Sequence, residues 1–234
     1  YQLVKKLYSA FEKKFNPLSH KNNIDEELKA LSKEIIQQVQ IRSERAILQS
    51  VITFINSILR TNFYKTEKVS VSYMYKPDFL SQVDYPVTPF GLFQVVGREF
   101  RGFHIRFRDI ARGGIRIVRS INYPTYMRNS ESIFDENYNL ALTQQRKNKD
   151  IPEGGSKGAV LLNWGFTDQM TVSFHKYIDG LLDLMMPDDS IVDHYGQEVI
   201  LFLGPDEWTA ELMDWAAERA RARGYKFWKA FTTG

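Results

Sequence analysis

Hydrophobic and polar residues change their spacing along the chain, and each spacing predicts a different kind of element. In residues 25–60 apolar side chains recur every three or four positions, as on one face of an amphipathic helix. Acidic residues at 25–27 suit a helix start, where the helix dipole favours negative charge. We therefore expect an N-terminal helical segment, residues 1–64, whose helices pack together or make subunit contacts.

Beyond residue 65 the spacing becomes alternating, as in strands that bury one face. Strands are predicted at 69–75, 92–96, 103–107 and 115–119. After residue 129, helical and extended patterns take turns along the chain. Helices are predicted at 137–149, 167–186 and 209–223, and strands at 158–163 and 199–203.

This order predicts an α/β domain over residues 65–234, with a mixed, largely parallel sheet flanked by helices. In such sheets ligands bind where strands end and helices begin. Residues at these junctions are therefore the candidates for chemistry.

Composition excludes several classes of protein. The chain has 234 residues, 43% of them hydrophobic, which is enough to bury a sizeable core. Lys and Arg total 31 against 28 Asp and Glu, with both signs interspersed, so nothing indicates a nucleic-acid partner. Without cysteine there is no disulfide, cysteine nucleophile or thiolate metal site. No apolar run approaches the roughly 20 residues that span a bilayer, so we expect no membrane partner, and we identify no metal site.

The most informative stretch is Pro-Glu-Gly-Gly-Ser-Lys-Gly at residues 152–158. Glycines let a backbone pass close to a ligand, and the apolar run at 159–162 predicts a strand behind them. Lys157 is therefore expected in a glycine-rich turn fixed to a rigid strand, where its amine could act as a base.

Two other junctions carry charge. Arg112, followed by two glycines between predicted strands, could grip a carboxylate with two parallel hydrogen bonds, although a solvated hairpin also explains it. Asp206 follows a buried strand and precedes a helix, and this position taken alone favours an ordinary helix cap. The cationic helix end at 145–149 is also explained by the helix dipole.

The chain lacks both common nucleotide-binding patterns, Gly-x-Gly-x-x-Gly and Gly-x-x-x-x-Gly-Lys-Ser/Thr. By its own motifs it has no nucleotide site.

Taken in order, these junctions resemble the glutamate dehydrogenase family, and in particular its large NAD-specific type. The resemblance covers the chain from about residue 90 to its end. It rests on residues 103–116, 138–158, 204–217 and 231–234. It implies a substrate-binding domain that is cut just before a nucleotide-binding domain, expected after residue 234, with NAD as the cofactor.

The resemblance also implies roles by position. Lys157 matches the catalytic lysine that activates water for attack on an iminium carbon. Asp206 matches the residue that carries a proton to and from the substrate nitrogen. Arg112 stands where the family usually has a lysine that binds a substrate carboxylate, and Gly113 would contribute its backbone.

Two positions depart from the family pattern. Gln145 replaces a second substrate-binding lysine, so Gln145, Lys147 or Lys149 is expected to contact the substrate instead. Trp208 replaces a small or polar residue two positions after Asp206, where an indole could narrow the site or mark a loss of activity.

The implied reaction converts L-glutamate and NAD into 2-oxoglutarate, ammonium and NADH, in a homo-oligomer of the cytoplasm or mitochondrion. Three alternatives stay open from the residues: a dehydrogenase of apolar amino acids, an inactive or regulatory dicarboxylate-binding relative, and an unrelated anion-binding module.

Overall fold

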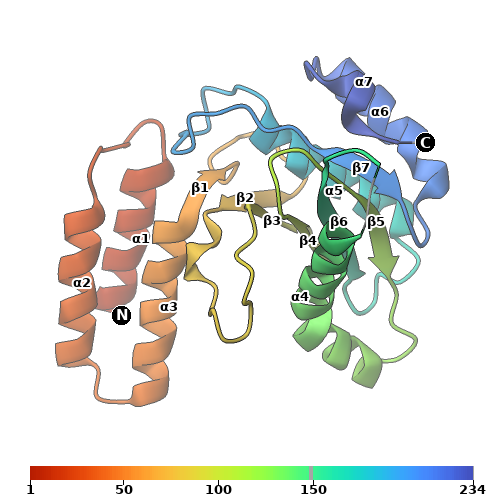
Figure 1. Ribbon diagram of the computed structural model, residues 1–234. Helices are drawn as coiled ribbons and strands as arrows, with labels where there is room; N and C mark the ends of the chain where they lie inside the picture. The colour runs from red at the N-terminus through yellow and green to blue at the C-terminus, as the bar shows by residue number, and fades with distance from the viewer. Residues whose placement is uncertain (148–149, 234) are drawn as a thin grey trace.

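A seven-stranded mixed sheet forms the centre of the structure, a computed structural model that describes residues 1–147 and 150–233 (Figure 1). The strand order is β1-β2-β3-β4-β6-β5-β7. The strands are β1 (Ile58–Thr61), β2 (Val71–Tyr75), β3 (Gly91–Val96), β4 (Phe100–Arg106), β5 (Ala111–Val118), β6 (Gly154–Leu162) and β7 (Phe202–Pro205).

The α/β class and the mixed sheet are confirmed, but less of the sheet is parallel than the sequence predicts. Four of the six strand pairings are antiparallel, and only β5 runs parallel to its neighbours, β6 and β7. The strands from β1 to β4 follow one another without a crossover helix, and such directly linked neighbours pair antiparallel.

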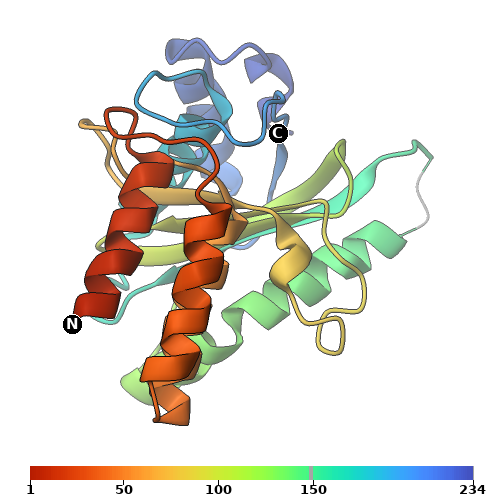
Figure 2. The same ribbon diagram turned by 90° about the vertical axis from the view of Figure 1, so that its left-hand side faces the viewer.

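Helices cover both faces of this sheet (Figures 1 and 2). On one face, α1 to α3 lie over the β1 end and α4 lies over β4 and β6, sharing a core with Leu92 and Ile105. On the other face, α5 and α6 pack on Phe93 and Val160. The α-helices are α1 (Gln2–Phe15), α2 (Asp25–Gln38), α3 (Arg42–Ser57), α4 (Tyr123–Arg146), α5 (Met170–Met185), α6 (Met213–Ala222) and α7 (Trp228–Phe231), with 3-10 turns at η1 (Pro77–Phe79) and η2 (Ala210–Leu212).

Helix α4 begins fourteen residues earlier than the sequence pattern indicates. Asn122 caps its start, since the Asn122 side chain accepts a hydrogen bond from the backbone N–H of Thr125 at 2.9 Å, and Pro124 lies in the first turn. Few of its early positions are buried, so they lack the apolar spacing by which a helix is found in sequence.

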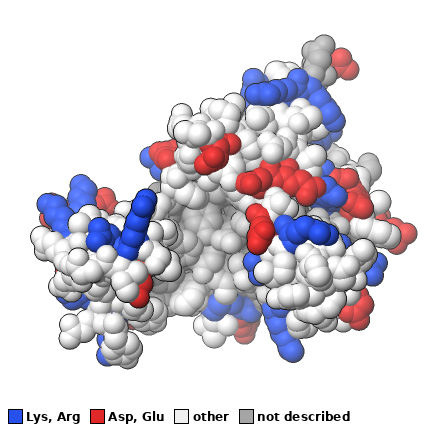
Figure 3. All heavy atoms as spheres, turned by 90° about the horizontal axis from the view of Figure 1, so that it is seen from below, with Lys and Arg blue, Asp and Glu red and all other residues white. Residues whose placement is uncertain are grey.

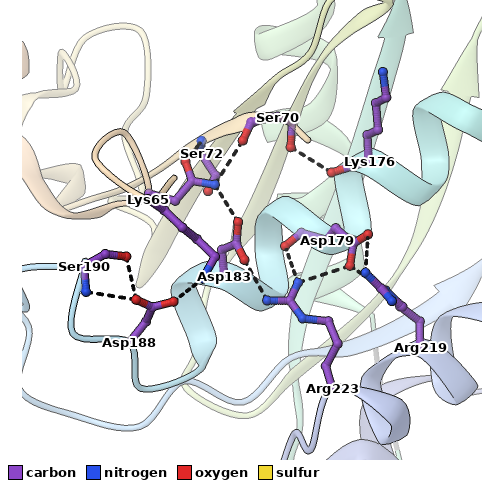
Figure 4. Close-up of polar contacts among 11 residues, drawn as sticks. Lys65, Ser70, Ser72, Lys176, Asp179, Asp183, Asp188, Ser190, Arg219 and Arg223 are labelled. Atoms are coloured by element: carbon purple, nitrogen blue, oxygen red, sulfur yellow. Dashed lines mark hydrogen bonds and ion pairs between the residues drawn. The ribbon is translucent and has the colours of Figure 1, made fainter. Parts of the chain in front are cut away.

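Helices α5 and α6 are joined by a regular ladder of side chains (Figure 4). Asp179 pairs with Arg219 at 2.8 Å, and Asp183 pairs with Arg223 at 2.7 Å. One turn earlier on each helix, the His175 ring stacks on Trp215 with 3.5 Å between ring centroids. Because α6 follows the segment that carries Asp206, this ladder fixes the far end of that segment.

The face seen in Figure 3 is hollowed between the N-terminal helices and the rest of the molecule, and few charged side chains lie in the hollow. A cavity of about 610 Å³ lies on this side of the sheet, between α3 and Phe134 of α4. Only uncharged residues line it, among them Phe54, Tyr75 and Phe103.

Within residues 1–147 and 150–233, no helix combines the length and the apolar character needed to cross a bilayer. In the same part of the chain, no cluster of three or more His, Asp or Glu side chains is placed to hold a metal ion.

Candidate active site

Lys157 and Asp206 meet across strand β5. Lys157 belongs to β6, Asp206 directly follows β7, and β5 lies between these two strands. The Lys157 Nζ donates a hydrogen bond to Oδ2 of Asp206, and the two side chains are 16% and 34% exposed. A cation and a carboxylate are thus held together where solvent can still reach them.

The expectation that Lys157 lies in a turn is wrong. Strand β6 begins at Gly154, so Lys157 is its fourth residue and pairs with Ile105 of β4. The glycines serve packing, because a Cβ on Gly155 would overlap the backbone nitrogen of Gln145. The amine is therefore held by a strand that is paired on both sides.

Gly114 makes the contact between the two side chains possible. The register of β5 with β6 puts Gly114 level with Lys157, and Gly114 pairs with Gly204 of β7 on its other side. A Cβ on Gly114 would lie 2.9 Å from the Cβ of Asp206 and 2.8 Å from the carbonyl oxygen of Pro205. The side chain that Gly114 lacks would occupy space that Asp206 needs.

Asp206 is fixed by Thr209 and is not a helix cap. The Asp206 backbone N–H donates to the Thr209 hydroxyl at 2.9 Å, and this hydroxyl donates to the carbonyl of Ile115 at 2.6 Å. Thr209 is fully buried, so it ties the segment after β7 to strand β5. The Asp206 carboxylate accepts its hydrogen bond from Lys157 in this position.

The environment favours the ionised form of Asp206. Partial burial alone would raise the pKa of this carboxyl, but the hydrogen bond and the positive charge of Lys157 outweigh it, with smaller contributions from the backbone N–H of Glu207 and from Arg116. The net effect is a pKa of Asp206 below its ordinary value. Asp206 is therefore an ionised carboxylate at neutral pH.

Arg112 lies on the same face of β5 as Gly114, two positions earlier, which is roughly 7 Å along the strand. Its guanidinium already pairs with a carboxylate of the chain, since Nε and Nη2 contact Oε2 of Glu153 at 3.1 and 2.9 Å. The Arg112 side chain remains 40% exposed. The geometry therefore shows that Arg112 can bind a carboxylate, and it shows Glu153 as the present partner.

The remaining predicted residues differ in their position. The Gln145 side chain accepts a hydrogen bond from the backbone N–H of Gly155 at 2.7 Å, so it supports the start of β6. Gly113 packs against Ser156, whose carbonyl oxygen a Cβ on Gly113 would overlap. Lys147 ends α4 with an exposed side chain. Lys149 lies outside the described residues.

Sequence reasoning missed Glu153 and Arg116. Glu153 stands inside the glycine motif, but nothing local indicates that it reaches the strand beside it. Arg116 is on the same face as Arg112 and Gly114 because side chains alternate along β5. Had the strand been predicted to start at 111 and not at 115, this period of two would have found it.

The glycines nearest the candidate residues, at 113, 114 and 155, have protein atoms where a side chain would go. They permit close packing of strands and helix.

The comparison with known proteins identifies the family. The family described as "Bacterial NAD-glutamate dehydrogenase, catalytic domain" matches residues 31–234. The chain is 52% identical to "Glutamate dehydrogenase 2" of Dictyostelium discoideum over its whole length, and 53% identical over 80% of its length to "NAD-specific glutamate dehydrogenase" of Saccharomyces cerevisiae. A protein of the latter name from Neurospora crassa is 50% identical over 87% of the chain.

The chain spans only 23%, 18% and 20% of the length of these three relatives. Because the family match covers most of the chain and includes all the candidate residues, the chain belongs to the family of NAD-glutamate dehydrogenase catalytic domains.

Proposed function

We propose that this chain provides the substrate-binding half of an NAD-dependent glutamate dehydrogenase, which oxidatively deaminates L-glutamate to 2-oxoglutarate and ammonium. The hydrogen-bonded pair of Lys157 and Asp206 carries the proposal. Deamination needs a group that activates water and a group that moves a proton on nitrogen, and two unlike titrating side chains in contact can divide these tasks.

Asp206 is suited to proton transfer at the amino nitrogen of the substrate. Because its pKa is lowered, it is ionised at neutral pH and can accept a proton from the substrate ammonium. Later it can return the proton to the departing ammonia. Its backbone is fixed through Thr209 to β5, so the carboxylate need not reorganise during transfer.

Lys157 is suited to activate the water molecule that attacks the substrate carbon. Its amine points from a strand that is paired on both sides, so its position is set by the sheet. The side chain would orient the water that attacks the substrate carbon, and in its neutral form its amine would accept the proton that this water loses.

Arg112 is suited to a substrate carboxylate. It lies on the same face of β5 as the glycine over which Lys157 and Asp206 meet, about two residues away along the strand. A five-carbon dicarboxylate could thus place one end at Arg112 while its α-carbon lies near Lys157. Binding would require the substrate to share or displace Glu153.

NAD would accept the hydride from the substrate carbon. The names of the relatives support NAD as the coenzyme. The sequence contains neither of the two common nucleotide-binding glycine patterns, so we expect a separate domain to bind NAD and the isolated chain to oxidise no glutamate.

A regulatory or inactive relative is the second candidate, and Trp208 is the observation that favours it. Its indole is 57% exposed, and its backbone has a left-handed φ of 66°. A bulky residue in this conformation is costly and calls for an explanation.

The test is full-length protein with Lys157→Ala, assayed for NADH formation from glutamate. Turnover should fall by at least about 100-fold while the unfolding temperature changes little, because loss of a general acid or base typically costs 10²–10⁴-fold. Asp206→Asn should behave alike. Normal turnover in either variant would refute the assignment, and glutamate binding without turnover by the unaltered protein would favour the regulatory role.

A further inference from the structure

We propose that Arg116 is a positioning residue that holds the segment carrying Asp206 against strand β5. This inference rests on the proposed function, because it concerns the proton acceptor of that reaction. Arg116 lies on the same face of β5 as Gly114, one alternation further along the strand.

The guanidinium of Arg116 is clamped between two carboxylates from different elements. Its Nη1 donates to Glu136 of α4 at 2.5 Å, and its Nη2 donates to Glu207 at 2.8 Å. Its side chain is 25% exposed, compared with 45% and 51% for Glu136 and Glu207. Arg116 therefore bridges the helix that covers the sheet and the residue that follows Asp206.

A backbone contact makes the same connection. The N–H of Ile117, the residue after Arg116, donates to the carbonyl of Glu207 at 3.1 Å. Glu207 is thus attached to β5 by its backbone and by its side chain. Because Asp206 directly precedes Glu207, movement of the Glu207 backbone would also displace the Asp206 carboxylate.

Asp206 itself hydrogen-bonds to Lys157. Arg116 donates to Glu136 and Glu207 and adds only a smaller contribution of its positive charge to the lowered pKa of Asp206. The charged groups that face Asp206 are Lys157 from β6, Arg116 from β5 and Glu207 from its own segment, with Glu136 of α4 behind Arg116.

Two substitutions should therefore move the acidity of Asp206 in opposite directions. Arg116→Gln removes a positive charge, which raises the pKa of Asp206. Glu207→Gln removes a negative charge and frees one terminal nitrogen of Arg116, and both changes lower the pKa of Asp206. A purely structural role would not produce shifts of opposite sign.

The experiment measures kcat and kcat/KM for glutamate against pH in the full-length protein. Arg116→Gln should lower kcat by about 10- to 100-fold with KM changed less than about threefold, since a displacement near 1 Å can cost that much. In the profile of kcat/KM against pH, the acid limb of Arg116→Gln should move to higher pH, and the acid limb of Glu207→Gln should move to lower pH. Arg119→Gln is the matched control, because Arg119 is an exposed cation at the end of the same strand that contacts neither Glu136 nor Glu207 among the described residues; it should change little.

The crystal structure of the Arg116→Gln protein gives a readout that does not depend on activity. We expect the segment at 205–208 to be displaced and the Lys157–Asp206 hydrogen bond to be lost. An unmoved segment, an unshifted acid limb, or shifts of the same sign in both variants would overturn the positioning role. If the unaltered protein oxidises no glutamate, the proposed function fails, and the structure of the variant still decides whether Arg116 positions Asp206.

Discussion

Asp206 packs against Gly114 so closely that any side chain at position 114 would overlap it: a Cβ on Gly114 would lie 2.9 Å from the Cβ of Asp206. Lys157 reaches Asp206 over this glycine, since the register of the parallel strands puts Gly114 level with Lys157. The two candidate catalytic side chains therefore depend on a residue that has no functional group.

Gly114→Ala should disable the site without unfolding the protein. The added methyl group would lie 2.8 Å from the carbonyl oxygen of Pro205, the last residue of β7, and 2.9 Å from the Cβ of Asp206, so the end of β7 and the Asp206 side chain must shift. We expect glutamate turnover in the full-length protein to fall by about 100-fold while the variant stays folded. Gly196→Ala is the control for activity: nothing lies within 4 Å of its added methyl group, and the strain that its φ of 69° imposes on alanine falls outside the candidate site. Equal turnover of the two variants would show that Gly114 has no such role.

Burial of His104 predicts a loss of stability on acidification. His104 is fully buried, and burial together with the nearby Arg106 lowers its pKa to about 3. Between pH 6.5 and pH 3 the unfolded chain binds a proton at this position that the folded chain does not. The free energy of unfolding should therefore decrease by up to about 1.4 kcal/mol per pH unit as the pH falls through this window.

His104→Phe should flatten this dependence, and urea unfolding at pH 7, 6 and 5 measures it. Neither ring nitrogen of His104 has a partner among the described residues, so an apolar ring loses no hydrogen bond that the structure shows. His104→Gln also removes the titration but buries an unsatisfied amide, and it should be less stable than His104→Phe by about 1–3 kcal/mol at pH 7. A wild-type slope in both variants would assign the pH dependence to other groups.

The sequence pattern located most elements but misplaced the strand ends that matter for the site. Strands β5 and β6 start four residues before their predicted positions, because their first residues are glycines, arginine and polar residues, which carry no strand signal. Lys157 and Asp206 could be chosen from motifs alone. Their contact could not, since it depends on the order of β6, β5 and β7 in the sheet, which no local pattern specifies.

Asp183 should be the most sensitive member of the ladder between α5 and α6. It is 5% exposed and accepts hydrogen bonds of 2.7 Å from both Arg223 and the Asn62 side chain (Figure 4). Asp183→Ala leaves both donors without this partner, and we expect it to lower the free energy of unfolding by about 3 kcal/mol. Asp183→Asn keeps one acceptor oxygen and should cost less.

A double-mutant cycle with Arg223→Met isolates the pair. The Arg223 change should cost much less in the Asp183→Ala background than alone, with a coupling of about 1–2 kcal/mol in urea unfolding. Additive effects would mean that the two side chains contribute independently.

The backbone of Trp208 has a conformation that is unfavourable for any residue with a Cβ. Its φ of 66° is left-handed, a conformation that costs a residue with a Cβ about 1–2 kcal/mol relative to glycine. Trp208→Gly should therefore have a free energy of unfolding about 1 kcal/mol higher than that of Trp208→Ala, although both variants lose the same indole. Urea unfolding of the two variants measures this difference. Equal stability of the two variants would show that the conformation relaxes without strain.

The same pair of variants tests whether the indole obstructs the site. The Trp208 ring lies beside Arg119, with 5.9 Å between the guanidinium carbon and the ring centroid. If the indole serves only this contact, its removal should change glutamate turnover in the full-length protein by less than about threefold. A gain of about 100-fold in Trp208→Ala would instead mean that Trp208 restrains an otherwise competent site, as the regulatory alternative requires.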